Sequence, residues 1–195
     1  MSINNLISYY QSFETDIENL SRYIEICEDN FQTYSVELTR LYLSICSEVD
    51  VALKYLCNLL GACDVNNIND YSRAIKKWCP ELIDKKVSLK GCSVYFSPWA
   101  ELHNADNTTW WREHNDVKHG RIQHYKNASL KNVLTAFCAL YTINVFIVFK
   151  QSCKQDPMAK FDFASMLYQT KGYFRLAQMK DIPFAYSIGE HSLFI

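Results

Sequence analysis

Apolar residues near the start of the chain recur at alternating spacings of four and three, which is the pattern of an α-helix with one apolar stripe. This pattern predicts a helix over residues 3–27, with a stripe formed by Leu6, Tyr10, Phe13, Ile17, Leu20, Ile24 and Cys27. Residues 34–62 predict a second helix, apolar over most of its circumference and ending near Gly61. A helix that is apolar nearly all round lies in the middle of a bundle.

Three more helices follow from periodicity and end signals. Residues 66–78 predict a short helix, and residues 107–119 predict a polar helix that Gly120 stops. Residues 130–153 predict a long apolar helix that begins after Ser129, a natural N-cap.

The remaining segments are mixed. Residues 87–99 predict an extended stretch or a small hairpin that turns at Lys90-Gly91. Towards the C-terminus, residues 161–168 predict a short helix and residues 182–195 predict an extended segment.

The composition agrees with an all-α class, because five glycines and four prolines are few for a β-sandwich or for a disordered chain. We therefore predict an up-and-down helical bundle with a short inserted helix. Residues 1–153 form the helical domain, and residues 154–195 form a C-terminal extension packed on the bundle. Residues 133–149 contain no charge, and we interpret them as a core helix of this bundle, with no membrane contact expected.

Eight cysteines occur without a Cys-x-x-Cys pair, which favours buried free thiols in a reducing cytosol over disulfides or a zinc site. The first residues show no basic region followed by an apolar core, so we expect no signal peptide and a cytoplasmic protein. The chain has no P-loop, dinucleotide-binding, zinc-protease or nucleophile-elbow motif, and we expect no metal and no cofactor.

The net charge is −1, but positive charge is concentrated in residues 110–131. The cations there are Arg112, Lys118, Arg121, Lys126 and Lys131, against Glu113 and Asp116. Such a run is either a solvated surface or an anion site, and the sequence leaves both open.

The predicted polar helix has two distinct faces at about 100° per residue. One face carries Arg112, Asn115, Asp116 and His119, and the opposite face carries Trp110 and Val117, with His114 on their side. Arginine binds a phosphate bidentately, and a histidine near neutrality exchanges a proton, so together they suit metal-free cleavage of an RNA phosphodiester. Two ordinary explanations also hold: His119 can stabilise the end of its helix, and Arg112 can pair with Asp116.

The segment "WWREHNDVKH" between two long helices resembles the Arg-x4-6-His motif of the HEPN (higher eukaryotes and prokaryotes nucleotide-binding) domain. Arg112 and His119 match it at its longest spacing, and Glu113 stands where the family more often has asparagine, aspartate or histidine. "SICSEVDVALKYLC", residues 44–57, is also similar to the second helix of bacterial HEPN-like proteins. The resemblance covers roughly residues 34–153.

The resemblance implies a metal-independent endoribonuclease, often a toxin or an antiphage defence effector, that works as a homodimer joined through its motif helices. His119 would remove the proton of the 2′-hydroxyl and Arg112 would stabilise the charge on phosphorus. Two copies of His119 across a two-fold axis would supply both a base and an acid. Lys118 and Arg121 would bind the RNA backbone, with Asn115 and Asp116 in support.

Glu48, a charge within the apolar second helix, is a candidate to orient Arg112 or His119; a structural salt bridge is an equally good explanation. The alternative function is a non-catalytic HEPN-like module that binds a nucleotide or a partner protein, such as an antitoxin or a defence-system component. Glu113 in the motif and the apolar stripe of the first helix favour this alternative.

Overall fold

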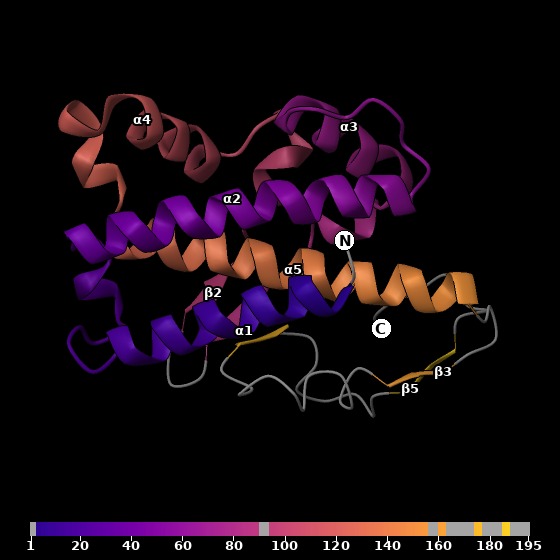
Figure 1. Cartoon of the computed structure of the whole chain (residues 1–195), viewed down its shortest axis with the longest axis horizontal. Helices are drawn as coiled ribbons and strands as arrows, with labels where there is room; N and C mark the ends of the chain where they lie inside the picture. Colours follow the sequence, from indigo (N-terminus) through magenta and orange to yellow (C-terminus); the bar gives the residue numbers. More distant parts are fainter. Residues whose placement is uncertain (1–2, 90–93, 156–159, 163–173, 177–184, 188–195) are drawn as a thin grey trace.

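The structure of the chain is a computed structural model that describes residues 3–89, 94–155, 160–162, 174–176 and 185–187. Three long helices lie side by side: α1 (Ile3–Leu20), α2 (Val36–Leu59) and α5 (Leu130–Gln155). Two shorter helices, α3 (Ile68–Trp78) and α4 (Thr109–His124), pack on the opposite side of α2 from α1 (Figure 1). The described chain is mostly helical, as the sequence predicts.

The two central helices are α2 and α5, which make the most extensive contact in the molecule. The Ser35 side chain caps α2 by accepting a hydrogen bond from the Leu38 amide at 3.1 Å. Gly61 follows the end of α2 with a φ of +82°, a conformation that favours glycine. The predicted range of 34–62 was therefore too long by two to three residues at each end.

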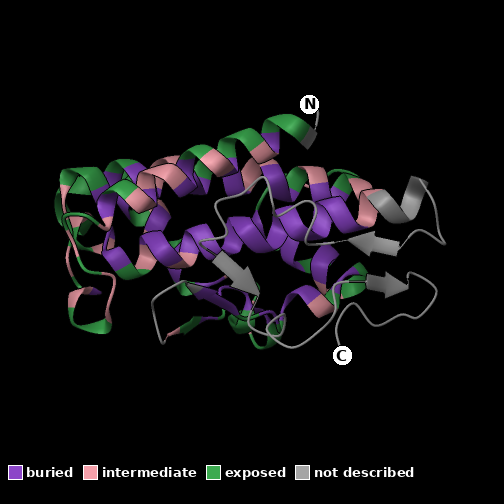
Figure 2. Cartoon of the chain, turned by 90° about the horizontal axis from the view of Figure 1, so that it is seen from below, coloured by how far each residue is buried: buried purple, intermediate pink, exposed green. Residues whose placement is uncertain are grey.

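The α5 helix is long and apolar enough to cross a membrane by length and composition, over Leu130–Gln151, but most of this segment is buried inside the protein. Figure 2 shows buried positions along the middle of the bundle and exposed positions on its outer helix faces. The interpretation of residues 133–149 as a core helix agrees with this burial.

The α1 helix buries Leu6, Tyr10, Phe13, Ile17 and Leu20 against α2 and α5. The apolar stripe of this helix is thus used inside the chain, which removes it as an argument for an external partner.

The α1 helix also ends at Leu20, seven residues before the predicted end. The following chain must cross to the start of α5, where the Leu130 amide donates to the Thr33 carbonyl at 2.8 Å and the Lys131 amide donates to the Phe31 carbonyl at 3.1 Å.

Five short strands complete the described fold. β1 (Val87–Leu89) pairs antiparallel with β2 (Tyr95–Phe96), which confirms the predicted hairpin, although its turn at residues 90–93 lies outside the described residues. β4 (Phe174–Leu176) adds to the other edge of β1.

The last two strands, β3 (Lys160–Asp162) and β5 (Ala185–Ser187), pair with each other. The predicted helix over residues 161–168 was therefore wrong at its start, where backbone pairing to β5 holds the chain extended, and its remainder lies outside the described residues. The extended segment predicted over residues 182–195 contains β5, and the rest of this segment also lies outside the described residues.

Candidate functional site on helix α4

A carboxylate from outside α4 holds its first turn. Glu101, in the short helix η3 (Ala100–His103), accepts hydrogen bonds through Oε2 from the Thr109 amide and from the Thr109 hydroxyl, both at 2.8 Å. Thr108 occupies the N-cap position, but its own side chain makes no capping bond. A negative charge at this end is stabilised by the helix dipole. The start of α4 therefore depends on a residue eight positions upstream.

Gly120 introduces a kink rather than a stop. Its backbone is non-helical, with φ −140° and ψ 48°, yet helical hydrogen bonding resumes and continues to His124. A Cβ atom at this position would lie 3.1 Å from Cδ2 of His124, so glycine allows the ring of His124 to approach the backbone closely. The prediction of a change at Gly120 was right, but the helix end was placed too early.

The two faces of α4 have the predicted burial. Trp110, Trp111, His114 and Val117 are buried, and Arg112, Asp116, Lys118 and His119 are exposed, with Asn115 half-buried. Arg121 is exposed beyond the kink. The residues proposed for chemistry are therefore accessible to a large substrate, and the packing face holds α4 against α2.

Arg112 points towards the start of α4. Its guanidinium donates to the Thr109 hydroxyl at 2.9 Å and to the Asn107 carbonyl at 3.3 Å. In the described part of the chain it forms no ion pair with Asp116 and no contact with His119. The α-carbons of Arg112 and His119 are separated by about 10 Å along the helix axis, from the rise of 1.5 Å per residue. The structure thus places both residues on one face without bringing their side chains together.

His114 is a packing residue. Its ring lies edge-on to Tyr42, with centroids 5.9 Å apart, and against Trp111 at 5.5 Å. Burial, together with the nearby Lys118 and His119, lowers the pKa of His114 from 6.5 to about 4. The imidazole is therefore neutral at pH 7 and suited to an apolar contact.

Glu48 lies away from α4. Tyr42, which is on α2, donates its hydroxyl to the Trp110 carbonyl and so marks the side of α2 that faces α4. Glu48 is six residues further along α2, or about 240° around it. It forms no hydrogen bond or ion pair with Arg112 or His119 within the described residues, so neither the orienting contact nor the alternative salt bridge is present.

Glu48 faces α5 instead. The Tyr55 hydroxyl donates to Oε1 of Gln151 at 3.4 Å, and Glu48 and Asn144 each precede these residues by seven positions on the parallel helices. This register puts Glu48 and Asn144 at the same level of the core. Oε1 of Glu48 and both amide atoms of Asn144 are buried without a hydrogen-bond partner in the described chain, and burial raises the pKa of Glu48. The α2 carboxylate on the side of α3 and α4 is Asp50, which accepts from the Tyr71 hydroxyl at 2.8 Å.

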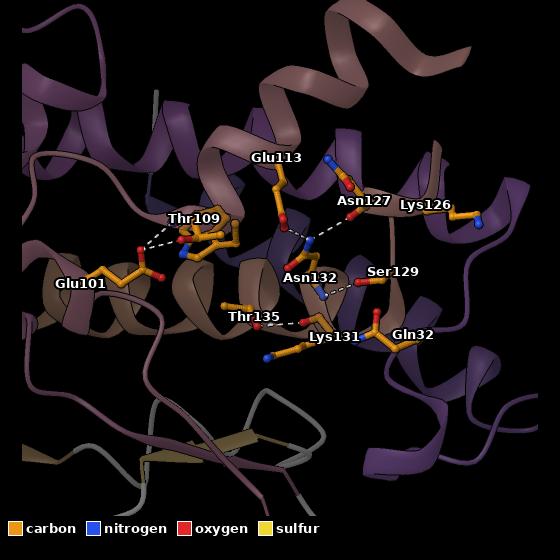
Figure 3. A pocket seen from close by; sticks show the side chains of 11 residues that line it. Gln32, Glu101, Thr109, Glu113, Lys126, Asn127, Ser129, Lys131, Asn132 and Thr135 are labelled. Carbon is orange, nitrogen blue, oxygen red and sulfur yellow. Dashed lines mark hydrogen bonds between the residues drawn. The ribbon is translucent and has the colours of Figure 1, made fainter. Parts of the chain in front are cut away.

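A polar pocket of about 330 Å³ lies between the start of α4 and the start of α5 (Figure 3). It is lined by Gln32, Glu101, Thr109, Trp110, Glu113, Lys126, Asn127, Ser129, Lys131, Asn132 and Thr135. Asn132 organises its centre by donating through Nδ2 to Oε2 of Glu113 and to the Asn127 carbonyl, the latter at 2.8 Å. Glu113 therefore turns away from the exposed face of α4 and into the pocket.

Sequence reasoning missed this pocket. The run of positive charge that includes Lys126 and Lys131 was the available signal, and it left an anion site open. The two carboxylates that line the pocket, Glu101 and Glu113, could not be predicted together from spacing. Glu101 meets Thr109, and Asn132 meets Glu113, only through tertiary structure.

No group of three or more histidine, cysteine, aspartate or glutamate side chains is placed to hold a metal ion in the described residues. The six cysteines whose side chains the structure describes are free, and four of them are buried (Cys46, Cys57, Cys79 and Cys138), in line with the expected thiols. Comparison of the chain with protein-family models, with curated proteins and with solved structures gives no match.

Proposed function

We propose that this protein is a cytoplasmic, metal-independent endoribonuclease of HEPN type that cleaves RNA through attack of the 2′-hydroxyl, as a toxin or an antiphage defence effector. The observation that carries the proposal is the exposed face of α4, on which Arg112 and His119 lie two helical turns apart with no carboxylate partner in the described chain. His119 acts as the general base and Arg112 stabilises the charge that develops on phosphorus. Lys118 and Arg121 attract the RNA backbone.

The proposal includes a homodimer, because one face offers one histidine while the reaction needs a base and an acid. Ile122, which is 93% exposed just beyond the kink, offers one apolar side chain to such an interface. A two-fold pair of α4 helices would bring both copies of His119 to one site.

A second candidate function is a non-catalytic HEPN-like module that binds a nucleotide or a partner protein. The engagement of Arg112 with Thr109 and Asn107 favours it, because a catalytic arginine must be free to bind phosphate. Glu113 also favours this alternative, because it turns into a polar pocket and away from the exposed face of α4.

The test is cleavage of total RNA and of tRNA in EDTA by the full chain. We expect the wild type to leave 2′,3′-cyclic phosphate ends and His119→Ala to lose at least about 100-fold of the rate, from the usual contribution of a general base. The matched control is His103→Ala, which removes an exposed histidine held by Asp84 at 2.6 Å. Equal cleavage by wild type and His119→Ala, with both proteins folded, would refute the catalytic assignment.

A further inference from the structure

The pocket between α4 and α5 carries opposite charges on different walls. Glu101 lies at one end in Figure 3 and Lys126 at the other, with Glu113 and Lys131 between them. Within the described part of the chain, none of these four residues forms an ion pair. Charged groups that share a small pocket without neutralising each other leave their hydrogen-bonding capacity to a ligand.

The acidic wall offers acceptors that are fixed in place. Glu101 uses Oε2 to hold Thr109, and Glu113 uses Oε2 to accept from Asn132, which leaves an Oε1 oxygen on each carboxylate for a ligand. Ionised carboxylates only accept hydrogen bonds. The ligand part that meets this wall must therefore present N–H or O–H donors.

The basic wall requires a negative group. Lys126 and Lys131 both line the pocket with exposed side chains, and the ammonium group of Lys126 lies over the Tyr34 ring, 5.9 Å from its centroid, which leaves Lys131 as the nearer cation for a bound ligand. The amides in the first turn of α5 are already used, because Leu130, Lys131 and Asn132 donate to Thr33, Phe31 and Ser129. The lysine side chains, rather than the end of the helix, are thus the groups that would hold an anion.

We propose that this pocket binds one nucleotide unit, with its phosphate on Lys131 and a guanine base on Glu101 and Glu113. Guanine is the base whose Watson–Crick edge presents two adjacent donors, N1–H and N2–H, whereas uracil places its single N3–H between two acceptors that a carboxylate repels. The cavity of about 330 Å³ lies at the small end of ligand sites, which suits one nucleotide and not a larger molecule.

The nucleotide unit can be a free guanosine monophosphate or a guanosine within an RNA strand. The second source rests on the proposed function, since it would place the pocket beside the cleavage site as a specificity determinant. Glu101 connects the pocket with Arg112, because the Thr109 hydroxyl that donates to Glu101 also accepts a hydrogen bond from Arg112.

The experiment is calorimetric titration of the full chain with GMP, UMP and inorganic phosphate, and titration of His119→Ala with a single-stranded oligouridine with or without one guanosine. We expect the guanine ligand to bind at least about tenfold more tightly than the uracil ligand, as the free monophosphate, within the oligonucleotide, or in both forms. A charge-assisted hydrogen bond allows a difference of this size. Glu113→Gln should abolish this preference, and Lys131→Gln should weaken GMP and UMP equally. Lys86→Gln, the same charge change at an exposed residue outside the pocket, should change nothing.

Equal binding of guanine and uracil ligands, or a preference that survives in both Glu113→Gln and Glu101→Gln, would overturn the proposal. Unfolding curves of each variant show whether a loss of binding is only a loss of fold. The result is separate from the proposed function: full cleavage by His119→Ala would refute the catalytic assignment of His119 and leave the guanine preference standing. Loss of the preference in an active nuclease would refute only the pocket.

Discussion

The neutral His114 makes the stability of the fold depend on pH in a defined direction. Burial holds the pKa of His114 at about 4 in the folded chain, whereas the unfolded chain has the ordinary value of 6.5. Between these two values the unfolded state binds the proton and the folded state does not, so the free energy of unfolding falls as the pH falls from 6.5 to 4. Above pH 6.5 both states are neutral and the full stability is present.

The size of the effect follows from the difference between the two pKa values. At about 1.4 kcal/mol per pKa unit, the folded chain loses about 3 kcal/mol by pH 4 through this histidine alone. Other groups also lose a stabilising charge under acid conditions, including Glu37 and Asp70, whose pKa values are lowered by Arg40 and by the Asn66 amide respectively. A variant that differs only at position 114 removes their contribution from the comparison.

The assay is urea unfolding of wild type and His114→Phe, followed by circular dichroism from pH 8 to pH 4. Phenylalanine keeps a ring against Tyr42 and Trp111 and removes both the titration and the buried Nδ1 atom, which has no hydrogen-bond partner in the described chain. The difference in the free energy of unfolding should shift by about 3 kcal/mol in favour of His114→Phe between pH 7.5 and pH 4. Parallel curves over this range would show that His114 is protonated in the fold, and would refute the packing role.

Two further substitutions test the packing of α2. Tyr42→Phe removes the buried hydroxyl that donates to the Trp110 carbonyl and should lower the free energy of unfolding by about 1–2 kcal/mol, against little change for the exposed Tyr34→Phe; equal effects in urea unfolding would contradict the bond. Glu48→Gln should stabilise the chain at pH 8, because burial raises the pKa of Glu48 and the charged form is penalised in the fold, and this advantage should shrink as the pH falls through that raised pKa. Destabilisation at pH 8 would show that Glu48 has a charged partner.

The sequence predicts the helices whose signals are local. The apolar residues of the two segments, and Ser129 before the second of them, specify the core helices α2 and α5, and both form. The end of α1 was misplaced, and the chain that follows it bonds to the start of α5, where the Leu130 and Lys131 amides donate to the Thr33 and Phe31 carbonyls. Such a bond joins residues about a hundred positions apart, and no periodicity reports it.

In the candidate site, too, the local features could be predicted from the sequence and the tertiary contacts could not. The two faces of α4 follow from a period of 3.6 residues, and the exposure of Arg112 and His119 agrees with it. Their side-chain directions do not follow from it. Thr109 donates a hydrogen bond to Glu101, and Glu113 accepts one from Asn132. These tertiary contacts direct the first half of the motif away from the second.

Catalysis by Arg112 and His119 requires a change in the present contacts of Arg112. The guanidinium must leave Thr109 and Asn107, two neutral acceptors whose hydrogen bonds contribute about 1 kcal/mol each to the fold. A phosphate offers a bidentate, charge-assisted contact that is roughly twice as strong per bond, so substrate binding can offset that loss. Within one chain the arginine would still have to span about two helical turns to reach the phosphate held by His119. Two motif helices that run antiparallel across a two-fold axis remove this distance, because the start of one then lies beside the end of the other. The proposed dimer can thus bring the arginine of one copy to the histidine of the other, and a monomeric chain with full activity would contradict it.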